Sequence, residues 1–151
     1  MVFEEFAASV GLRLRVALVA AYGPEVGLDA TAEAVAWGWQ HWDRVSAMNN
    51  PAGYLYRVGQ TAAMRQMRRR DVLMPTLEHG DMPEFDPGLV PALLALTEKQ
   101  RVAVVMVHGY GWSQAETAAL LDISHATVRT HIARAMARLH EALEVHEHVD
   151  D

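Results

Sequence analysis

The chain has 151 residues, of which 51% are hydrophobic and 21% charged, with a formal net charge of −6 and no cysteine. Without cysteine the chain cannot form a disulfide framework or a thiolate zinc site. It also has no apolar run of about 18 residues, so no membrane-spanning helix is expected. These features favour a globular protein of one domain or two small ones, in the cytoplasm.

The net acidity argues against a nucleic-acid binder, but the charges are unevenly distributed. Residues 1–70 carry eight arginines and six acids, and no acid lies between Arg44 and Arg70. Residues 71–90 carry five acids and no lysine or arginine, and residues 91–151 carry five basic residues and eight acids. Such a chain would bind DNA weakly by itself, because few phosphates are neutralised. A partner that holds it on DNA is therefore expected.

Three helices are predicted in the first 70 residues. The first is marked by an apolar stripe that runs from Phe3 to Leu18. Residues 29–44 predict a second helix, rich in alanine and tryptophan. Pro51 begins a third, since proline suits the first turn of a helix. The inner face of the third helix is predicted to comprise Tyr54, Leu55, Val58, Ala62 and Met67.

Residues 71–90 predict a linker, because they combine three prolines and two glycines with charges that are all negative. An apolar helix is expected to begin at Pro91. Thr97 then caps a further helix over 98–108, which Gly109 and Gly111 end. No segment shows strand-like alternation of useful length. The predicted fold is all-α, with two small helical domains joined by the acidic linker.

Residues 113–139 have the pattern of a DNA-binding helix-turn-helix. Ser113 caps a short helix with Glu116 as its capping-box partner, and Asp122 stands at the turn, where it tolerates positive φ. Ser124 caps a second helix whose inner face carries Val128 and Ile132. The outward residues, which are donors for phosphates and base edges, are His125, Thr127, Arg129, Thr130, His131, Arg134 and Arg138. The alternative is a helical hairpin with a solvated basic face.

These motifs together resemble a bacterial RNA polymerase sigma factor of the extracytoplasmic-function (ECF) type. The resemblance covers most of the chain. In the C-terminal half it rests on Leu96-Thr97, Arg101, Val104, Gly109, Ser113, Glu116, Ala118, Thr127-Val128 and Arg134-Ala135. In the N-terminal half it rests on residues 3–6, 41–45, 51–58 and 68–70. The chain departs from the family pattern in having one glutamate, Glu33, in the second helix, Thr61 in place of an asparagine, and Asp122 and Ala126 in place of glycines.

The resemblance implies that the two halves of the chain bind different parts of the promoter. Residues 1–70 would form a region 2-like domain that binds core polymerase and the −10 promoter element, and 91–145 a region 4-like domain that binds the −35 element. Residues 71–90 would be the linker and 146–151 an acidic tail. The second helix would dock on the polymerase through Glu33, Trp37, Gln40 and His41, although plain core packing is the alternative for its tryptophans.

The resemblance also implies the DNA-reading residues. Met48, Asn49 and Asn50 would receive a base extruded from the melted strand, since such a base needs amide donors and an apolar wall; a polar turn before a helix is the alternative. The −10 element would face Arg57, Gln60, Thr61, Arg65, Arg68 and Arg69. The −35 element would be read by His125, Thr127, Arg129 and Thr130. Arg134 would meet phosphate or the polymerase.

No catalytic residue, cofactor or metal is predicted. The sequence supplies no nucleophile with an orienting base and no glycine-rich phosphate loop. His140 and Glu144 share a helix face, with His146 and His148 beyond, but a charged, fraying tail accounts for them. The expected partners are core RNA polymerase, promoter DNA and an anti-sigma factor. Two alternatives stay open: a stand-alone helix-turn-helix regulator, and a sigma-like interaction protein that sequesters polymerase.

Overall fold

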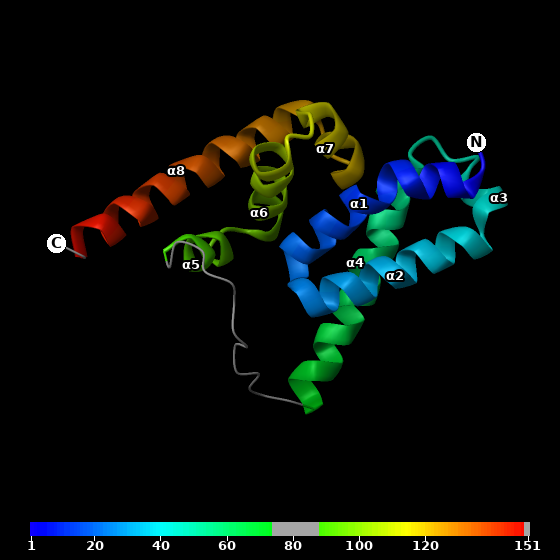
Figure 1. The fold of residues 1–151 in the computed structure, drawn as a ribbon, viewed down its shortest axis with the longest axis horizontal. Helices are drawn as coiled ribbons and strands as arrows, with labels where there is room; N and C mark the ends of the chain where they lie inside the picture. Colours follow the sequence, from blue (N-terminus) through cyan, green and yellow to red (C-terminus); the bar gives the residue numbers. More distant parts are fainter. Residues whose placement is uncertain (74–87, 150–151) are drawn as a thin grey trace.

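The structure is a computed structural model that describes residues 1–73 and 88–149, with side chains described for 1–69 and 88–144. Within these ranges every regular element is helical, which confirms the all-α prediction (Figure 1). The N-terminal half comprises α1 (Phe3–Tyr22), α2 (Pro24–Gln40), α3 (Trp42–Val45) and α4 (Pro51–Leu73). The C-terminal half comprises α5 (Leu89–Leu94), α6 (Glu98–Val104), the π-helical turn η1 (Val105–Gly109), α7 (Gln114–Leu121) and α8 (His125–Val149).

Several helix boundaries differ from those predicted. The second helix begins at Pro24, not near Asp29, because proline occupies its first turn and Gly23 before it adopts φ +90°. It ends at Gln40, and His41 separates it from α3. The helix expected over 98–108 becomes a π-helical turn from Val105 onward. Both ends of the predicted linker are helical, through Leu73 and from Leu89, and residues 74–87 lie outside the described part.

The predicted helix caps are present. The Thr97 side chain accepts a hydrogen bond from the Gln100 N–H, and the Gln100 side chain accepts from the Thr97 N–H, which completes a capping box. Ser113 Oγ accepts from the Glu116 N–H at 3.0 Å, and Ser124 Oγ accepts from the Thr127 N–H at 3.0 Å. Between these two helices Asp122 adopts a left-handed conformation, φ 56° and ψ 48°.

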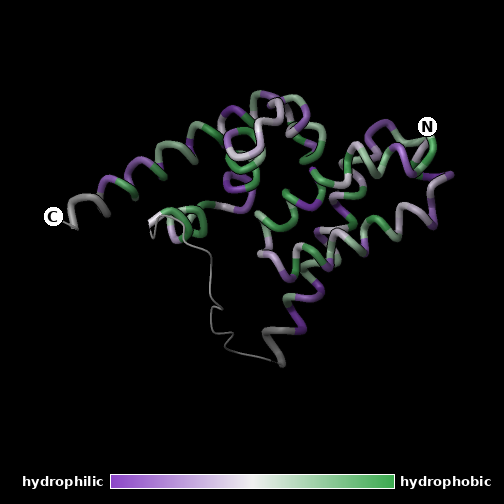
Figure 2. Tube along the Cα trace, viewed as in Figure 1, coloured by the Kyte–Doolittle hydropathy of each residue, from purple (hydrophilic) through white to green (hydrophobic). Residues whose placement is uncertain are grey.

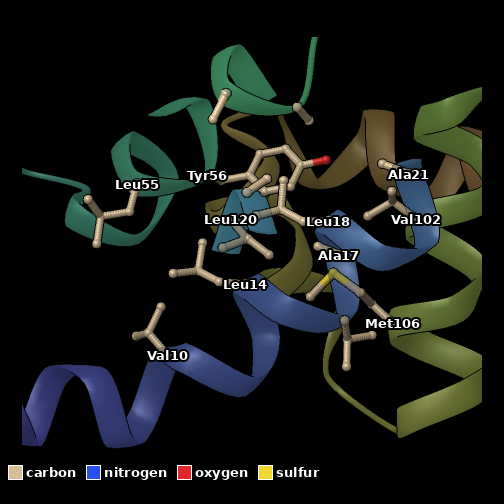
Figure 3. Packing of buried hydrophobic residues seen from close by; sticks show 14 of the residues in the cluster. Val10, Leu14, Ala17, Leu18, Ala21, Leu55, Tyr56, Val102, Met106 and Leu120 are labelled. Carbon is tan, nitrogen blue, oxygen red and sulfur yellow. The ribbon is translucent and has the colours of Figure 1, made fainter. Parts of the chain in front are cut away.

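The largest hydrophobic core is shared by the two halves of the chain. It contains the predicted stripe of α1 from Phe6 onward, including Leu14 and Leu18, together with Val102, Met106 and Leu120 from the C-terminal half (Figure 3). The C-terminal half also has two smaller cores of its own, in which α8 packs against α5, α6 and α7. Along α8, hydrophobic and hydrophilic segments alternate with the turns of the helix, as expected for one buried face (Figure 2).

The predicted inner face of α4 is largely confirmed. Leu55 and Ala62 are buried, and Tyr54 and Val58 are partly buried. Met67 is 42% exposed, so its placement on the inner face is wrong: it lies near the end of α4, at the edge of an open apolar groove rather than in the core. Among the described residues, no helix combines the length and apolar character needed to cross a bilayer.

Gly27→Ala is expected to destabilise the fold by about 2 kcal/mol, because overpacking a tight contact costs about that much. At Gly27 the helices α1 and α2 approach so closely that an added Cβ would lie 2.5 Å from the Val19 Cα. Backbone cannot move aside as a side chain can. Gly11→Ala is the matched control: no atom lies within 4 Å of its added Cβ, so higher helix propensity should stabilise it. Urea denaturation of both variants measures the difference, and equal midpoints would contradict the prediction.

Candidate nucleic-acid interface

The helix α8 presents one buried and one exposed face. Val128, Ile132 and Ala135 are buried against the helix-turn-helix core. Five of the predicted outward residues are exposed: His125, Arg129, Thr130, Arg134 and Arg138. No acidic residue lies between Ser124 and Arg138, so this surface carries no negatively charged side chain. Its N-terminal turn also offers the positive end of the helix dipole to a phosphate.

Several polar groups at the start of α8 are held by neighbours. His125 Nε2 lies 2.9 Å from Gln114 Oε1, so the first turn of α7 positions this ring. Thr127 is partly buried, and its hydroxyl lies 2.7 Å from the hydroxyl of Ser124. Thr130 Oγ1 donates to the Ala126 carbonyl at 3.1 Å. These contacts hold three of the four predicted base readers. The side chain of the fourth, Arg129, is exposed and makes no such contact within the described residues.

Acidic pH is expected to destabilise the fold through His131, which was predicted to point outward but is partly buried. Burial is the main cause that lowers the pKa of His131 below 6.5, and Lys99 and Arg134 add to it. The unfolded chain therefore takes up a proton where the folded chain does not, so the free energy of unfolding falls as the pH drops below about 6.5. In His131→Gln the part of the pH dependence that comes from this imidazole should disappear. Urea titrations on either side of that pH test it, and an unchanged pH dependence would contradict it.

The loop before α4 and the turn of the helix-turn-helix enclose one small cavity. It has a volume of about 160 Å³ and is lined by Met48, Asn50, Tyr54, Arg57 and Asp122. Asn50 is fixed at both ends of its amide. Its Oδ1 accepts from the Gly53 N–H at 3.1 Å, which caps α4, and its Nδ2 donates to the Ala119 carbonyl at 2.7 Å. Asn49, one residue earlier, is exposed.

Some side chains on the arginine-rich side of α4 already bind other residues of the protein. Arg57, Thr61, Arg65, Arg68 and Arg69 are all exposed. However, Arg65 forms a salt bridge with Glu33 at 3.2 Å, and Gln60 is partly buried and donates to Glu98 at 3.2 Å. Thr61 Oγ1 donates to the carbonyl of Arg57 within the helix. The side chain of Arg70 lies outside the described residues.

The predicted polymerase-docking residues lie along the end of α2. Glu33 and Gln40 are exposed, while the Trp37 ring stacks on His41 at 4.2 Å between centroids. Trp42 packs against Phe6 in the core. Trp39, which was considered with Trp37 and Trp42 but not included among the predicted docking residues, is 57% exposed. On the single helix predicted over 29–44, Trp37, Trp39 and Trp42 could not all face inward, which is the signal that one is a surface residue; in the structure Trp42 lies in the separate helix α3.

The described side chains include no group of three or more histidine, cysteine, aspartate or glutamate residues arranged to hold a metal ion. The side chains of His146 and His148 lie outside that part of the chain, although α8 continues through Val149. Residues 146–149, predicted as part of a fraying tail, therefore continue α8.

A capped helix-turn-helix with an exposed, acid-free second helix defines a DNA-binding protein. Comparison with known proteins narrows the class. Residues 89–139 match the family described as Sigma-70, region 4. The chain is 31% identical over 128 residues to the RNA polymerase sigma-E factor of Streptomyces antibioticus, covering 79% of this chain and 71% of that protein. It is 31% identical over 96 residues to the ECF RNA polymerase sigma factor SigM of Mycobacterium tuberculosis, covering 58% of this chain and 49% of that protein.

Two solved structures share the fold. The sigma factor RpoE of Bartonella quintana, in complex with the anti-sigma factor NepR, superposes with a TM-score of 0.62 at 22% identity, covering 95% of this chain and 97% of that one. The protein CnrH, in complex with the cytosolic domain of CnrY, gives a TM-score of 0.60 at 22% identity, with coverage of 95% and 88%.

The chain therefore belongs to the sigma-70 family of RNA polymerase sigma factors, and within it to the ECF type. The family resemblance read from the sequence is confirmed. Sigma factors direct RNA polymerase to promoters, so the predicted function in transcription initiation, with polymerase and promoter DNA as partners, is confirmed at the level of the family. The role of each named residue stays a prediction.

Proposed function

We propose that this sigma factor reads its promoters with two separate surfaces, one in each half. The region 2-like part, residues 1–70, engages the −10 element, and the region 4-like part, residues 91–145, engages the −35 element, with 71–90 as linker and 146–151 as tail. The observation that carries the proposal is the exposed basic face of α8, whose buried side fixes it against α7 in helix-turn-helix geometry. We also propose that the protein has no catalysis of its own and acts in the cytoplasm.

The upstream surface consists of His125, Thr127, Arg129, Thr130 and Arg134. The first four lie within two turns of the start of α8, which is the part of a recognition helix that reaches base edges. Arginine can bind guanine O6 and N7 with two hydrogen bonds. Arg134 is placed further along, where a recognition helix leaves the groove and meets phosphate or polymerase.

The downstream surface combines α4 with the loop before it. Arg57, Gln60, Thr61, Arg65, Arg68 and Arg69 supply donors to the strand, and Met48, Asn49 and Asn50 supply the amides and apolar wall for an extruded base. The cavity at this loop supports the assignment, since three of its five lining residues belong to the proposed surface: Met48, Asn50 and Arg57.

The polymerase-binding surface is proposed to comprise Glu33, Trp37, Gln40 and His41, with Trp39 added by its exposure. An exposed aromatic ring beside polar neighbours is the common form of an interface anchor. An anti-sigma factor is proposed as a further partner, as in the two structural relatives, each of which was solved with another protein bound.

Run-off transcription with purified core polymerase, this protein and a library of genomic fragments tests the proposal, together with co-elution on a sizing column. Transcripts that depend on the protein, and that start at a shared pair of elements, are expected. Co-elution without transcripts would favour a protein that sequesters polymerase. Binding to DNA without co-elution would favour a stand-alone regulator, and either result would contradict the proposal.

A further inference from the structure

An open apolar groove lies apart from the proposed DNA-reading and polymerase-binding surfaces. It is found between helix α5 and the turn that joins α1 to α2 (Figure 1). Its volume is about 620 Å³, within the range of about 300–1,000 Å³ that small-molecule sites occupy. The lining comes from α1 between Leu12 and Tyr22, from the start of α2, from Met67 of α4, and from α5 and η1. None of the residues proposed to bind DNA or polymerase lines it.

Apolar side chains that face solvent form most of this groove. Of the nine large apolar side chains that are exposed among the described residues, five line it: Leu12, Leu28, Met67, Leu94 and Tyr110. Their exposed fractions lie between 42% and 59%. Exposed apolar surface is unfavourable in water, and its concentration in one concave place is typical of a binding site. A hydrocarbon ligand would cover these side chains.

The charged groups of the groove are cationic. Its described lining contains two arginines, Arg15 and Arg101, and no acidic residue, although the whole chain has a net charge of −6. The Arg101 guanidinium donates to the carbonyls of Ala20 and Ala21 and to carbonyls within residues 93–96. These bonds join the end of α1 to α5, which fixes the shape of the groove. No described carboxylate binds Arg101, so its positive charge acts on whatever occupies the groove.

Arg15 can bind a ligand directly. Its side chain is exposed and forms no hydrogen bond or ion pair with another described residue. It lies on the same face of α1 as Leu12 and Val19, because residues three and four apart are neighbours on a helix. A planar guanidinium binds a carboxylate through two parallel N–H···O bonds. The groove therefore offers an apolar wall with a carboxylate-binding group beside it.

We infer that this groove binds a long-chain fatty acid, with the hydrocarbon against the apolar lining and the carboxylate on Arg15. The apolar lining selects the chain, and two arginines without an acid select an anionic head. The lining on α1 extends from residue 12 to residue 22, about 15 Å along the helix, which suits an extended chain better than a compact ring. The ligand is a single free molecule, since binding to an anionic bilayer relies on clusters of four or more basic residues.

Calorimetric titration of the full chain tests the inference, with octanoate, decanoate and laurate as ligands. Each acid is kept below the concentration at which it forms micelles. One molecule per chain should bind saturably, and the affinity should rise about ten-fold for each two carbons added, because two further methylenes are buried. Affinity that does not vary with chain length would overturn the inference, and so would binding that appears only when micelles form.

The role of the charge is tested with 1-decanol, which has the chain length of decanoate and no carboxylate. It should bind about ten-fold more weakly than decanoate, because hydrogen bonds to charged groups are the stronger ones. Arg15→Gln should weaken decanoate binding by about ten-fold and leave 1-decanol binding unchanged. Equal affinity of the unmodified chain for the acid and the alcohol would overturn the inference.

Arg44→Gln is the matched control for Arg15→Gln. It removes the same charge from an exposed position that does not line the groove, and it should change neither affinity. Equal weakening of decanoate by both variants would indicate attraction to the overall charge and would overturn the inference. Leu28→Glu places a carboxylate at an exposed lining position and should abolish decanoate binding. Its melting temperature without ligand checks that the fold is intact.

Other occupants of the groove would give different results. A second copy of the chain would appear as a dimer by light scattering, and a dimer that excludes decanoate would overturn the inference. A groove already covered by another segment of the same chain would give no saturable binding, with the same consequence. The inference does not depend on the promoter-reading residues, so failure of the run-off experiment would leave it standing.

Discussion

Arg129→Ala is expected to weaken binding to the −35 element by about ten- to a hundred-fold, because a bidentate contact from arginine to a base contributes about 1–3 kcal/mol. Its side chain is exposed on the second turn of α8. The preference for the cognate element over a scrambled duplex should fall with the affinity. Fluorescence anisotropy with both duplexes measures the two quantities at one salt concentration, which must be fixed because phosphate binding varies with salt.

Arg134→Ala is the matched control for this experiment. It removes the same charge from another exposed position, five residues further along α8. If Arg134 contacts phosphate, its loss should weaken cognate and scrambled duplexes alike and leave the preference unchanged. Loss of preference in Arg134→Ala but not in Arg129→Ala would show that the reading residues have been assigned to the wrong part of the helix.

Asn49→Ala is expected to reduce open-complex formation by about ten-fold or more while closed binding is little changed, since each lost hydrogen bond to an extruded base leaves a buried polar group unpaired at about 1–3 kcal/mol. Asn49 is exposed, so its replacement should leave the stability of the free protein intact. Permanganate reactivity of the melted strand measures opening, and a mobility shift on ice measures closed binding.

Asn50→Ala should behave differently from Asn49→Ala. It removes the cap of α4, at about 1 kcal/mol of folding stability, and the bond to Ala119 as well. Opening should fall together with the melting temperature. Ser46→Ala, at an exposed residue of the same loop, is the control and should change neither. Normal opening in both asparagine variants would remove the loop from the proposed downstream surface.

Local features of this fold could be predicted from the sequence because they depend on short-range chemistry. Ser113, Ser124 and Thr97 cap helices within three residues of themselves, and Asp122 tolerates the left-handed turn by its own side chain. The burial of Val128 and Ile132 follows from helical spacing alone. These contacts involve residues close in sequence, so one pass along the chain finds them.

The contacts between the halves could not be predicted in that way. Asn50 and Ala119 are 69 residues apart, and Tyr22 and Glu98 are 76 apart. The sequence pattern does not single out Leu120, which lies in the core shared with α1. Nor does the sequence show which tryptophan packs inward: Trp42 contacts Phe3 and Phe6, whereas Trp39 contacts Phe3 and is still 57% exposed. These contacts between distant residues depend on tertiary packing, which the sequence pattern does not reveal.

The left-handed turn at Asp122 has a consequence for engineering this protein. Glycine would relieve the backbone strain there at no steric cost, and a designer who seeks a hardier variant would choose it first. The same replacement would remove a carboxylate from the lining of the small cavity, which Arg57 also lines. A variant chosen for its thermal stability would therefore also carry a changed charge beside Asn50 and Arg57. The two effects of Asp122→Gly are separable, because a melting temperature reports the first and promoter binding reports the second.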